Sequence, residues 1–450
     1  MDYSNDNYRY YVLTLLTLGY VFSFIDRQIL AILQEPIKLD LGLSDLQLGL
    51  ISGLSFALFY VLMGLPIARW ADRGCRRNIV ALAVGVWSLM TVFCGMAQNF
   101  WQMLLARIGV AVGEAGGSPP SHSLISDIFA PHQRATAIGV YSIGVNVGIL
   151  FGFLFGGWLN YLYGWRMTFL IVGVPGLLLA LLMRYTIREP LRGFSETSSG
   201  QSASGIGAAP PMKEVIRHLI GLRSFRHLAL ASGLSAFAGY ATANWMPSFL
   251  RRSYQLDSAD IGTWLALFAG VGGAIGTFSG SWLADRLSHR DLRWYAWTPA
   301  LALALSTPLV FITFWAESFQ GTMLAHFYPT CVSTLYLAPV IAVTHRLVEN
   351  RMRALASAIL FLVINIIGLG LGPLSVGFLS DLLGATHGRE SLRLAMMMLC
   401  TLATGWAVVH FIAGARHLRA DFVAASSAVT SAVDTSSKSE GEGQRCSVGC

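Results

Sequence analysis

Long apolar runs separated by short polar segments dominate the chain. A helix needs about 20 mostly apolar residues to cross the ~30 Å hydrocarbon core of a bilayer, and runs of that length recur throughout the sequence. The predicted spans lie near residues 10–33, 46–68, 79–98, 100–124, 135–160, 167–187, 226–250, 259–284, 294–315, 320–346, 352–380 and 392–414. This pattern predicts an all-α membrane protein with twelve transmembrane helices, arranged as six plus six.

The distribution of Lys and Arg indicates the orientation of these spans. If both termini are cytoplasmic, 23 of the 31 basic residues fall on the cytoplasmic side and six on the outside, while Arg27 and Arg107 lie within spans. Cytoplasmic loops of membrane proteins carry an excess of positive charge. We therefore expect both termini in the cytoplasm. The compact loops and the absence of a targeting segment favour a multi-pass protein of the bacterial inner membrane.

The polar segments divide the chain into four parts. Residues 1–187 and 226–414 are the two predicted six-helix bundles. Residues 188–225 contain the stretch SETSSGQSASGIGAAPP, and residues 415–450 are rich in Ser, Ala and Gly. Because such compositions bury little apolar surface, we expect a flexible cytoplasmic linker at 188–225 and a disordered cytoplasmic tail at 415–450.

Composition excludes several classes of protein. Of the 450 residues, 54% are hydrophobic and only 12% are charged, about half the ~25% typical of soluble domains. The net charge of +7 is spread over short clusters between spans, so we expect no nucleic-acid partner. The six cysteines form no C-x-x-C pair with accompanying His, which predicts no metal site. The chain lacks a nucleotide-binding loop and a nucleophile–base constellation, so we expect neither a cofactor nor enzymatic activity.

Two signals recur in matched order in both halves, which indicates an internal duplication. The motif A-D-R, with a further Arg five residues past the Asp, follows both the second and the eighth span. An Arg that stands twelve residues before an Asn opens both the fifth and the eleventh span. The repeated charged positions are Asp72, Arg73 and Arg134 in the first half, and Asp285, Arg286 and Arg353 in the second. We therefore expect two pseudo-symmetric bundles.

The six-plus-six arrangement and the duplicated A-D-R loops resemble the major facilitator superfamily over about residues 8–415. The segments FIDRQIL in span one and RIGVAVGEAGGSPPSHSLISDIF in span four resemble its Spinster group, whose eukaryotic members are linked to sphingolipid and lysophospholipid export. Two positions depart from the superfamily's patterns. Cys75 stands where the loop motif usually has Gly, and Phe153 stands where antiporters usually have Pro.

The resemblance implies that the repeated charged positions are gating residues. Asp72 would be a latch that pairs with cations of the other half and holds the outward-facing state. The alternative for this loop is control of topology by positive charge alone. That alternative accounts for Arg76 and Arg77 but leaves Asp72 unexplained.

Four charged residues lie inside predicted spans: Asp26 and Arg27 in span one, and Arg107 and Glu114 in span four. Ionisable groups at mid-membrane cost from ~2.5 to more than ~10 kcal/mol and mark functional sites. Because seven residues make nearly two helical turns, Arg107 and Glu114 project from one face. We predict that Asp26 and Glu114 exchange protons, with Arg27 and Arg107 as counter-charges or as ligands of an anionic headgroup. The alternatives are a fixed ion pair between the spans and, for Arg107, a snorkelling position near the outer interface.

Small residues shape spans four and five. Residues 116–120, GGSPP, interrupt span four just after Glu114, which predicts that Glu114 borders the central cavity. Glycines recur every four residues from Gly144 to Gly156, a spacing that allows another helix to approach closely, as tight packing or as a sliding surface. His122 is either a proton relay or an ordinary hydrogen-bonded side chain.

These observations together predict a secondary transporter that works by alternating access. The expected substrate is amphiphilic, lipid-like or anionic, the expected coupling ion is H⁺, and the expected working form is a monomer surrounded by membrane lipids. The alternative is a passive uniporter or a lipid sensor with a transporter-like body.

Overall fold

The computed structural model describes residue 3, residues 5–194 and residues 211–445, and this described part contains helices and no strand. The side chains of residues 277, 278, 281, 284, 285, 350 and 424–445 lie outside the description. The predicted gating residue Asp285 is therefore placed only by its backbone, on a helix. Residues 195–210 of the expected linker also lie outside the described residues.

The first half of the chain forms one helical bundle. Its elements are α1 (Asp6–Leu41), α2 (Asp45–Gly49), the π-helix η1 (Leu50–Leu54), α3 (Ser55–Arg73), α4 (Arg76–Met96), α5 (Phe100–Ala115), α6 (Ser118–Ile128) and α7 (Pro131–Thr186). Helix α7 contains two spans, because Gly164 has φ 77° and ψ 167° and turns the chain back. Glycine takes this positive φ without the penalty that a Cβ would bring.

The second half forms a matching bundle. Its elements are α9 (Met212–Gly221), α10 (Arg223–Tyr254), α11 (Ser258–Leu265), the π-helix η2 (Ala266–Val271), α12 (Gly272–Ser288), α13 (Trp294–Trp315), α14 (Phe319–Val332), α15 (Leu337–Arg346), η3 (Asn350–Met352), α16 (Arg353–Ile364), the π-helix η4 (Asn365–Leu371), α17 (Gly372–His387), η5 (Gly388–Glu390) and α18 (Ser391–Arg445). The π-helices η1 and η2 interrupt the second and the eighth span, which are equivalent positions in the predicted duplication.

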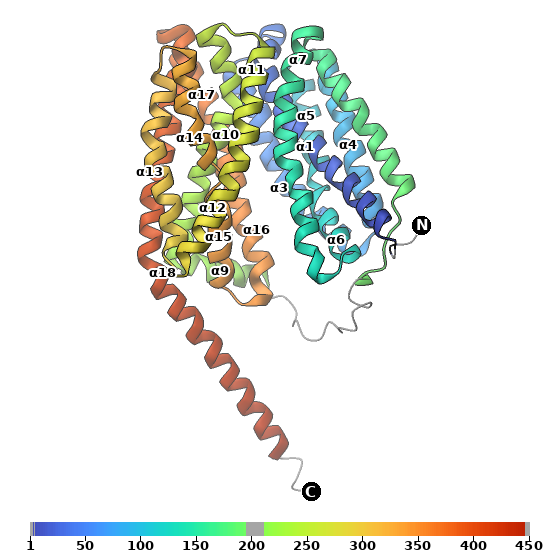
Figure 1. Cartoon of the computed structure of the whole chain (residues 1–450), viewed down its shortest axis with the longest axis vertical. Coiled ribbons are helices and arrows are strands. Elements are labelled where there is room, and N and C mark those ends of the chain that lie inside the picture. Colours follow the sequence, from blue (N-terminus) through green and yellow to red (C-terminus); the bar gives the residue numbers. More distant parts are fainter. Residues whose placement is uncertain (1–2, 4, 195–210, 446–450) are drawn as a thin grey trace.

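The membrane-spanning content agrees with the twelve predicted helices. Within the described residues, 8 helical segments are long and apolar enough to cross a membrane. Two of these segments, Pro131–Thr186 and Arg353–Val423, each turn back at a glycine with positive φ, Gly164 or Gly388, and so cross twice. The α5–α6 pair and the more polar α10 supply the remaining spans. Figure 1 shows the two bundles side by side, with both termini toward the same end. The Lys and Arg distribution identifies this end as the cytoplasmic one.

Part of the predicted flexible linker is ordered against the second bundle. There, α9 forms a helix whose Val215 and Leu219 are completely buried in the core of that bundle. The tail continues as the helical backbone of α18 to Arg445 and projects from the bundle (Figure 1). The disorder expected for residues 415–450 stays a prediction.

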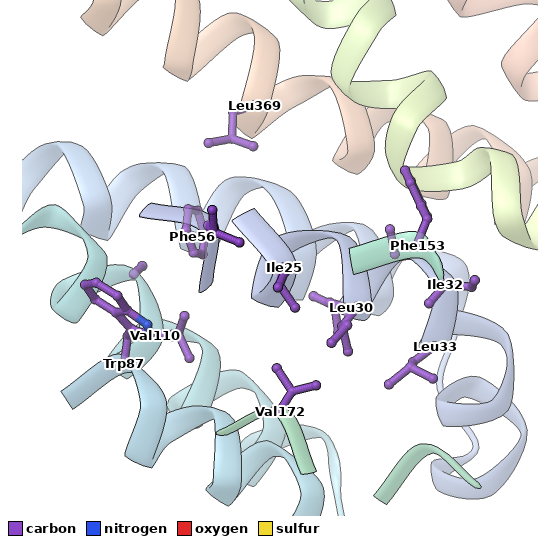
Figure 2. Close-up of a cluster of buried hydrophobic side chains, with 14 of the residues drawn as sticks. Ile25, Leu30, Ile32, Leu33, Phe56, Trp87, Val110, Phe153, Val172 and Leu369 are labelled. Atoms are coloured by element: carbon purple, nitrogen blue, oxygen red, sulfur yellow. The ribbon is translucent and has the colours of Figure 1, made fainter. Parts of the chain in front are cut away.

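Glycines bring α1 and α7 close together within the first bundle. A Cβ at Gly148 would lie 2.5 Å from the Cβ of Phe24, and one at Gly152 would lie 2.7 Å from the Cβ of Gln28. Both helices belong to the same bundle, so the glycine repeat serves tight packing and not sliding between bundles. The neighbouring apolar face of α1, which includes the buried Ile25, points among the surrounding helices (Figure 2). Span one is thereby held at a defined rotation.

Glycines also bring the two bundles together. A Cβ at Gly157 of α7 would lie 2.3 Å from the carbonyl oxygen of Ser258 and 2.9 Å from the Cα of Gly262 on α11. Since both contacts are with backbone atoms, no side-chain movement could relieve them. This contact lies near the extracellular ends of the spans and holds that side closed.

We predict that Gly157→Ala disfavours the extracellularly closed arrangement by about tenfold or more, equivalent to about 1.4 kcal/mol. Spin labels at residues 65 and 354, on the cytoplasmic ends of α3 and α16 in a cysteine-depleted protein, would report shorter distances by electron paramagnetic resonance. The matched control is Gly139→Ala, since a Cβ at Gly139 meets no atom within 4 Å. An unchanged distance distribution for Gly157→Ala would contradict the prediction.

Candidate functional site

An ion pair with one accessible end joins α1 to α5 inside the first bundle. The Nε of Arg27 donates to Oε2 of Glu114 at 2.6 Å, and Nη2 lies 2.5 Å from the same oxygen. One turn earlier on α1, the Oγ of Ser23 also donates to Oε2, at 2.9 Å. The Glu114 side chain is fully buried, whereas the Arg27 side chain is 17% exposed. Solvent or a ligand can therefore reach the guanidinium group of Arg27 but not the carboxylate of Glu114.

A second ion pair between the same helices is enclosed at both ends. Nη1 of Arg107 donates to Oδ2 of Asp26 at 3.0 Å, and both side chains are 2% exposed. The Oγ1 of Thr91 on α4 donates to Oδ1 of Asp26 at 2.8 Å. The snorkelling position considered for Arg107 is therefore wrong, because Asp26 supplies a counter-charge inside the bundle and no path to the interface is needed.

Aromatic rings surround the guanidinium group of Arg27. Its Cζ lies 5.0 Å from the ring centres of Phe24 and Phe56 and 5.2 Å from that of Tyr60. The Phe56 ring also lies 5.4 Å from Cζ of Arg107, between the two cations. Cation–π contacts contribute about 0.5–2 kcal/mol each. A cation beside apolar rings can hold the charged head of an amphiphile while its chain follows the rings.

The helix break next to Glu114 is confirmed, and it opens onto a cavity inside one bundle. Helix α5 ends at Ala115 and α6 begins at Ser118. The cavity beside Glu114 is lined by residues of the first bundle alone, including Tyr20 and Tyr141. Glu114 was expected to border the central cavity of the protein. The cavity that it borders lies instead within the first bundle. In the described part of the chain, no three His, Cys, Asp or Glu side chains form a group that could hold a metal ion.

Asp72 and Arg73 lie exposed at the cytoplasmic end of α3. Among the described side chains, neither takes part in an ion pair with the other bundle. The latch predicted for Asp72 is thus not engaged here, as expected for an arrangement that is closed at the opposite, extracellular side. Its gating role remains a prediction.

The remaining predicted gating residues that the structure describes contact their own bundle or begin a helix. Arg286 on α12 stacks on Trp282, with Cζ 5.2 Å from the ring centre. Arg353 donates through Nε to the backbone oxygen of His345 at 3.2 Å. Arg134 lies half-buried in the first turn of α7. The repeated arginines thus occupy corresponding cytoplasmic helix ends, as the duplication predicts.

Arg76 has more than a topological role. It is only 1% exposed, its Nε donates to Oε1 of Glu189 at 2.8 Å, and its Nη1 pairs with Asp127. Burial opposes ionisation of Glu189, but hydrogen bonds from the backbone of Arg77 and from Arg76 hold its pKa below the ordinary value. Arg76 therefore joins the A-D-R loop to the segment that follows α7.

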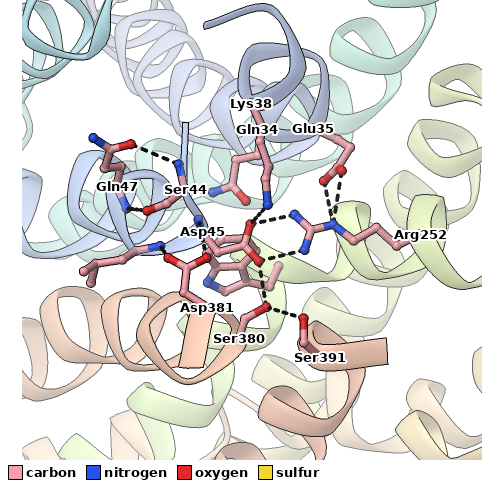
Figure 3. Close-up of polar contacts among 12 residues, drawn as sticks. Gln34, Glu35, Lys38, Ser44, Asp45, Gln47, Arg252, Ser380, Asp381 and Ser391 are labelled. Atoms are coloured by element: carbon pink, nitrogen blue, oxygen red, sulfur yellow. Dashed lines mark hydrogen bonds and ion pairs between the residues drawn. The ribbon is translucent and has the colours of Figure 1, made fainter. Parts of the chain in front are cut away.

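A charged network joins the two bundles at their extracellular ends (Figure 3). Near the end of α10, Nη1 and Nη2 of Arg252 donate to the two carboxylate oxygens of Asp45, each at 2.7 Å. The Nε of Arg252 lies 2.9 Å from Oε2 of Glu35, and Nζ of Lys38 lies 2.5 Å from Oδ1 of Asp45. The side chains of Arg252 and Asp45 are 11% and 3% exposed, so solvent screens this network little.

Helix α17 of the second bundle completes the network. The Oγ of Ser380 donates to Oδ2 of Asp45 at 2.6 Å. The carboxylate of Asp381 accepts the backbone N–H groups of Asp45 at 3.0 Å and of Leu46 at 2.8 Å. A carboxylate of one bundle thus caps the first turn of α2 in the other, where the helix dipole favours negative charge.

Sequence analysis missed this network, because it treated Lys38 and Arg252 only as positive charges on the outside. A usable signal was present: the acidic Glu35 and Asp45 lie at the same predicted membrane surface. The signal was incomplete, because spacing along the chain does not reveal that α10 lies beside α1 and α2.

Comparisons with known proteins agree with this architecture. The family described as the Major Facilitator Superfamily matches residues 16–373. An "MFS-type efflux pump" of Mycolicibacterium smegmatis is 32% identical over 411 residues, which cover 90% of this chain and 92% of the relative. "Protein spinster homolog 1" of Xenopus tropicalis is 25% identical over 83% of this chain and 74% of its own length.

A solved structure is also similar over nearly the whole chain. It is that of a bacterial homologue of the human lysosomal transporter Spinster, in an inward-facing and unoccupied conformation. The two chains are 33% identical and superpose with a TM-score of 0.79, covering 94% of this chain and 98% of that one.

We predict that Arg252→Gln opens the extracellular side, because it leaves two buried carboxylates without their shared cation. The reporter is Ser52→Cys: Ser52 is 6% exposed and its Oγ donates to Oδ1 of Asn244 across the bundles at 3.0 Å. A membrane-impermeant maleimide added outside the cells should label the reporter at least about tenfold faster in the Arg252→Gln protein.

The matched control is Arg166→Gln, which breaks an extracellular ion pair with Asp40 inside one bundle, at 2.7 Å. Labelling of the reporter should not change in this variant, and the protein without Ser52→Cys gives the background. Equal labelling rates in both Gln variants would show that the inter-bundle network does not hold the extracellular side closed.

Proposed function

The chain belongs to the Major Facilitator Superfamily, and from this premise we propose that it is a proton-coupled secondary transporter of an anionic, lipid-like amphiphile. The proposed location is the bacterial inner membrane. The observation that carries the proposal is the Arg27–Glu114 pair, in which a buried carboxylate depends on a guanidinium that is partly accessible.

Competition between the substrate and Glu114 for Arg27 would couple substrate binding to proton uptake. An anionic headgroup that binds Arg27 draws the guanidinium away from Glu114. A buried carboxylate that loses its counter-charge is strongly disfavoured and takes up a proton instead. When the substrate leaves, Arg27 returns and the proton is released. The coupling step is the replacement of Glu114 by the headgroup as the partner of Arg27.

The surroundings of Arg27 support an amphiphilic substrate. The rings of Phe24, Phe56 and Tyr60 lie around the cation and offer apolar surface to an acyl chain. The Arg107–Asp26 pair is enclosed within the same bundle. We propose that Asp26 takes part in the same proton exchange.

Alternating access would follow from two sets of charges at opposite ends of the bundles. The extracellular network around Asp45 and Arg252 is engaged in this structure. We propose that it separates in the outward-facing state, while Asp72 and Arg73 and their repeats in the second bundle come together on the cytoplasmic side.

We predict that Asp26→Asn and Glu114→Gln each reduce accumulation driven by a pH gradient at least about tenfold, while downhill exchange continues. The assay uses purified protein in lipid vesicles, an imposed pH gradient and fluorescently labelled lysophosphatidylglycerol as the probe. The control is Glu214→Gln, which neutralises an exposed carboxylate on α9.

Undiminished accumulation in both neutralised variants would refute proton coupling at these residues. If the unmodified protein moves the probe downhill but never concentrates it against a gradient, the protein is a passive uniporter instead.

A further inference from the structure

A cavity of about 50 Å³ lies beside Glu114 within the first bundle. A space of about 10–15 Å³ is enough to hold one water, which also needs two to four polar partners, so this cavity has room for water. The polar side chains at the cavity are Tyr20, Ser23, Arg27, Tyr60, Glu114, Ser118, Ser121 and Tyr141. The cavity is therefore polar enough to hold water.

The two oxygens of Glu114 have different surroundings. Oε2 accepts hydrogen bonds from Arg27 and from Ser23. Oε1 is buried and has no hydrogen-bond partner within the described residues. A buried carboxylate oxygen left without a partner is costly, and an ordered water is the usual remedy. Because Arg27 covers the other oxygen, the cavity is the open approach to the carboxylate.

Hydroxyl groups continue from the cavity toward the cytoplasmic half of the bundle. The side chains of Ser118 and Ser121 line the cavity together with those of Tyr20 and Tyr141. The rings of Tyr20 and Tyr141 stack with their centres 4.5 Å apart. The half-exposed His122 ring meets the edge of Tyr141 at 5.1 Å. Hydroxyls both donate and accept, so such a series can pass a proton along.

The groups that face Glu114 come from several helices around the cavity. Helix α1 presents Arg27 and the paired Asp26, and α3 presents Tyr60 on the side of Arg27. Helix α4 contributes only Val80, Val84 and Trp87 to the cavity wall. Apart from Glu114 itself, Arg27 is therefore the one charged side chain among the cavity-lining residues, and the other polar side chains there that face Glu114 carry neutral hydroxyls.

We infer that the cavity is a water site through which protons travel between Glu114 and the cytoplasmic side, inside the first bundle. This inference rests on the proposed proton coupling. Water at Oε1 gives or takes the proton, and the hydroxyls of Ser118, Ser121 and Tyr141 relay it toward His122.

The test follows protonation of Glu114 directly and needs no substrate. After a rapid pH jump, infrared difference spectroscopy records the C=O stretching band of protonated carboxyl groups, and Glu114→Gln identifies the band of Glu114 by its loss. Two independent changes disrupt the route. Ser118→Ala combined with Ser121→Ala removes hydroxyls, and Gly19→Val fills the cavity, where a Cβ at Gly19 meets only the movable end of Met183 at 3.0 Å and Val84 at 3.7 Å.

In each disrupted protein we expect the Glu114 band to keep its amplitude but to develop at least about tenfold more slowly. The matched controls are Ser142→Ala, whose exposed hydroxyl bonds to its own helix, and Gly139→Val, which projects into open space. Both should keep the native rate.

The possible failures are distinguishable. If Glu114→Gln removes no carboxyl band, Glu114 does not change protonation, and both the proposed function and the route fail. If the band belongs to Glu114 but develops at the native rate in both disrupted proteins, the route is overturned while proton coupling stands.

Discussion

A charge in the interior of a bilayer requires a counter-charge, and this constraint organises the first bundle. Asp26 and Arg27 are adjacent on α1 but diverge by about 100° around the helix. One side chain meets Arg107 and the other meets Glu114, nearly two turns apart on α5. Removing either arginine leaves a buried carboxylate unpaired, so the pairs fix the register of α1 against α5.

The two ion pairs differ in how far their arginines can be reached. The side chains of Arg107 and Asp26 are both enclosed, at 2% exposure each. Arg27 reaches past a fully buried Glu114 to a partly exposed position among aromatic rings. The accessible arginine is thus the one that the proposal assigns to the substrate headgroup.

The contacts between the bundles explain how such a site can be reached from one side at a time. At the extracellular ends, backbone meets backbone at Gly157 and Gly262, and Arg252 and Asp381 hold Asp45 and its helix. At the cytoplasmic ends, Asp72 and Arg73 are exposed. Buried ion pairs form with strict geometry or not at all, so this set of contacts favours discrete arrangements over a continuum.

The sequence by itself determined the twelve spans, their orientation, the duplication, the break after Glu114 and the four charged residues within the membrane. These follow from apolar run length, loop charge and residue type, which act locally along the chain. Only the tertiary structure decided that Asp26 pairs with Arg107 and Arg27 with Glu114, that Arg76 is buried, and that Arg252 crosses to Asp45. Such partners depend on the rotation and neighbourhood of whole helices, and the local pattern of a sequence leaves these undetermined.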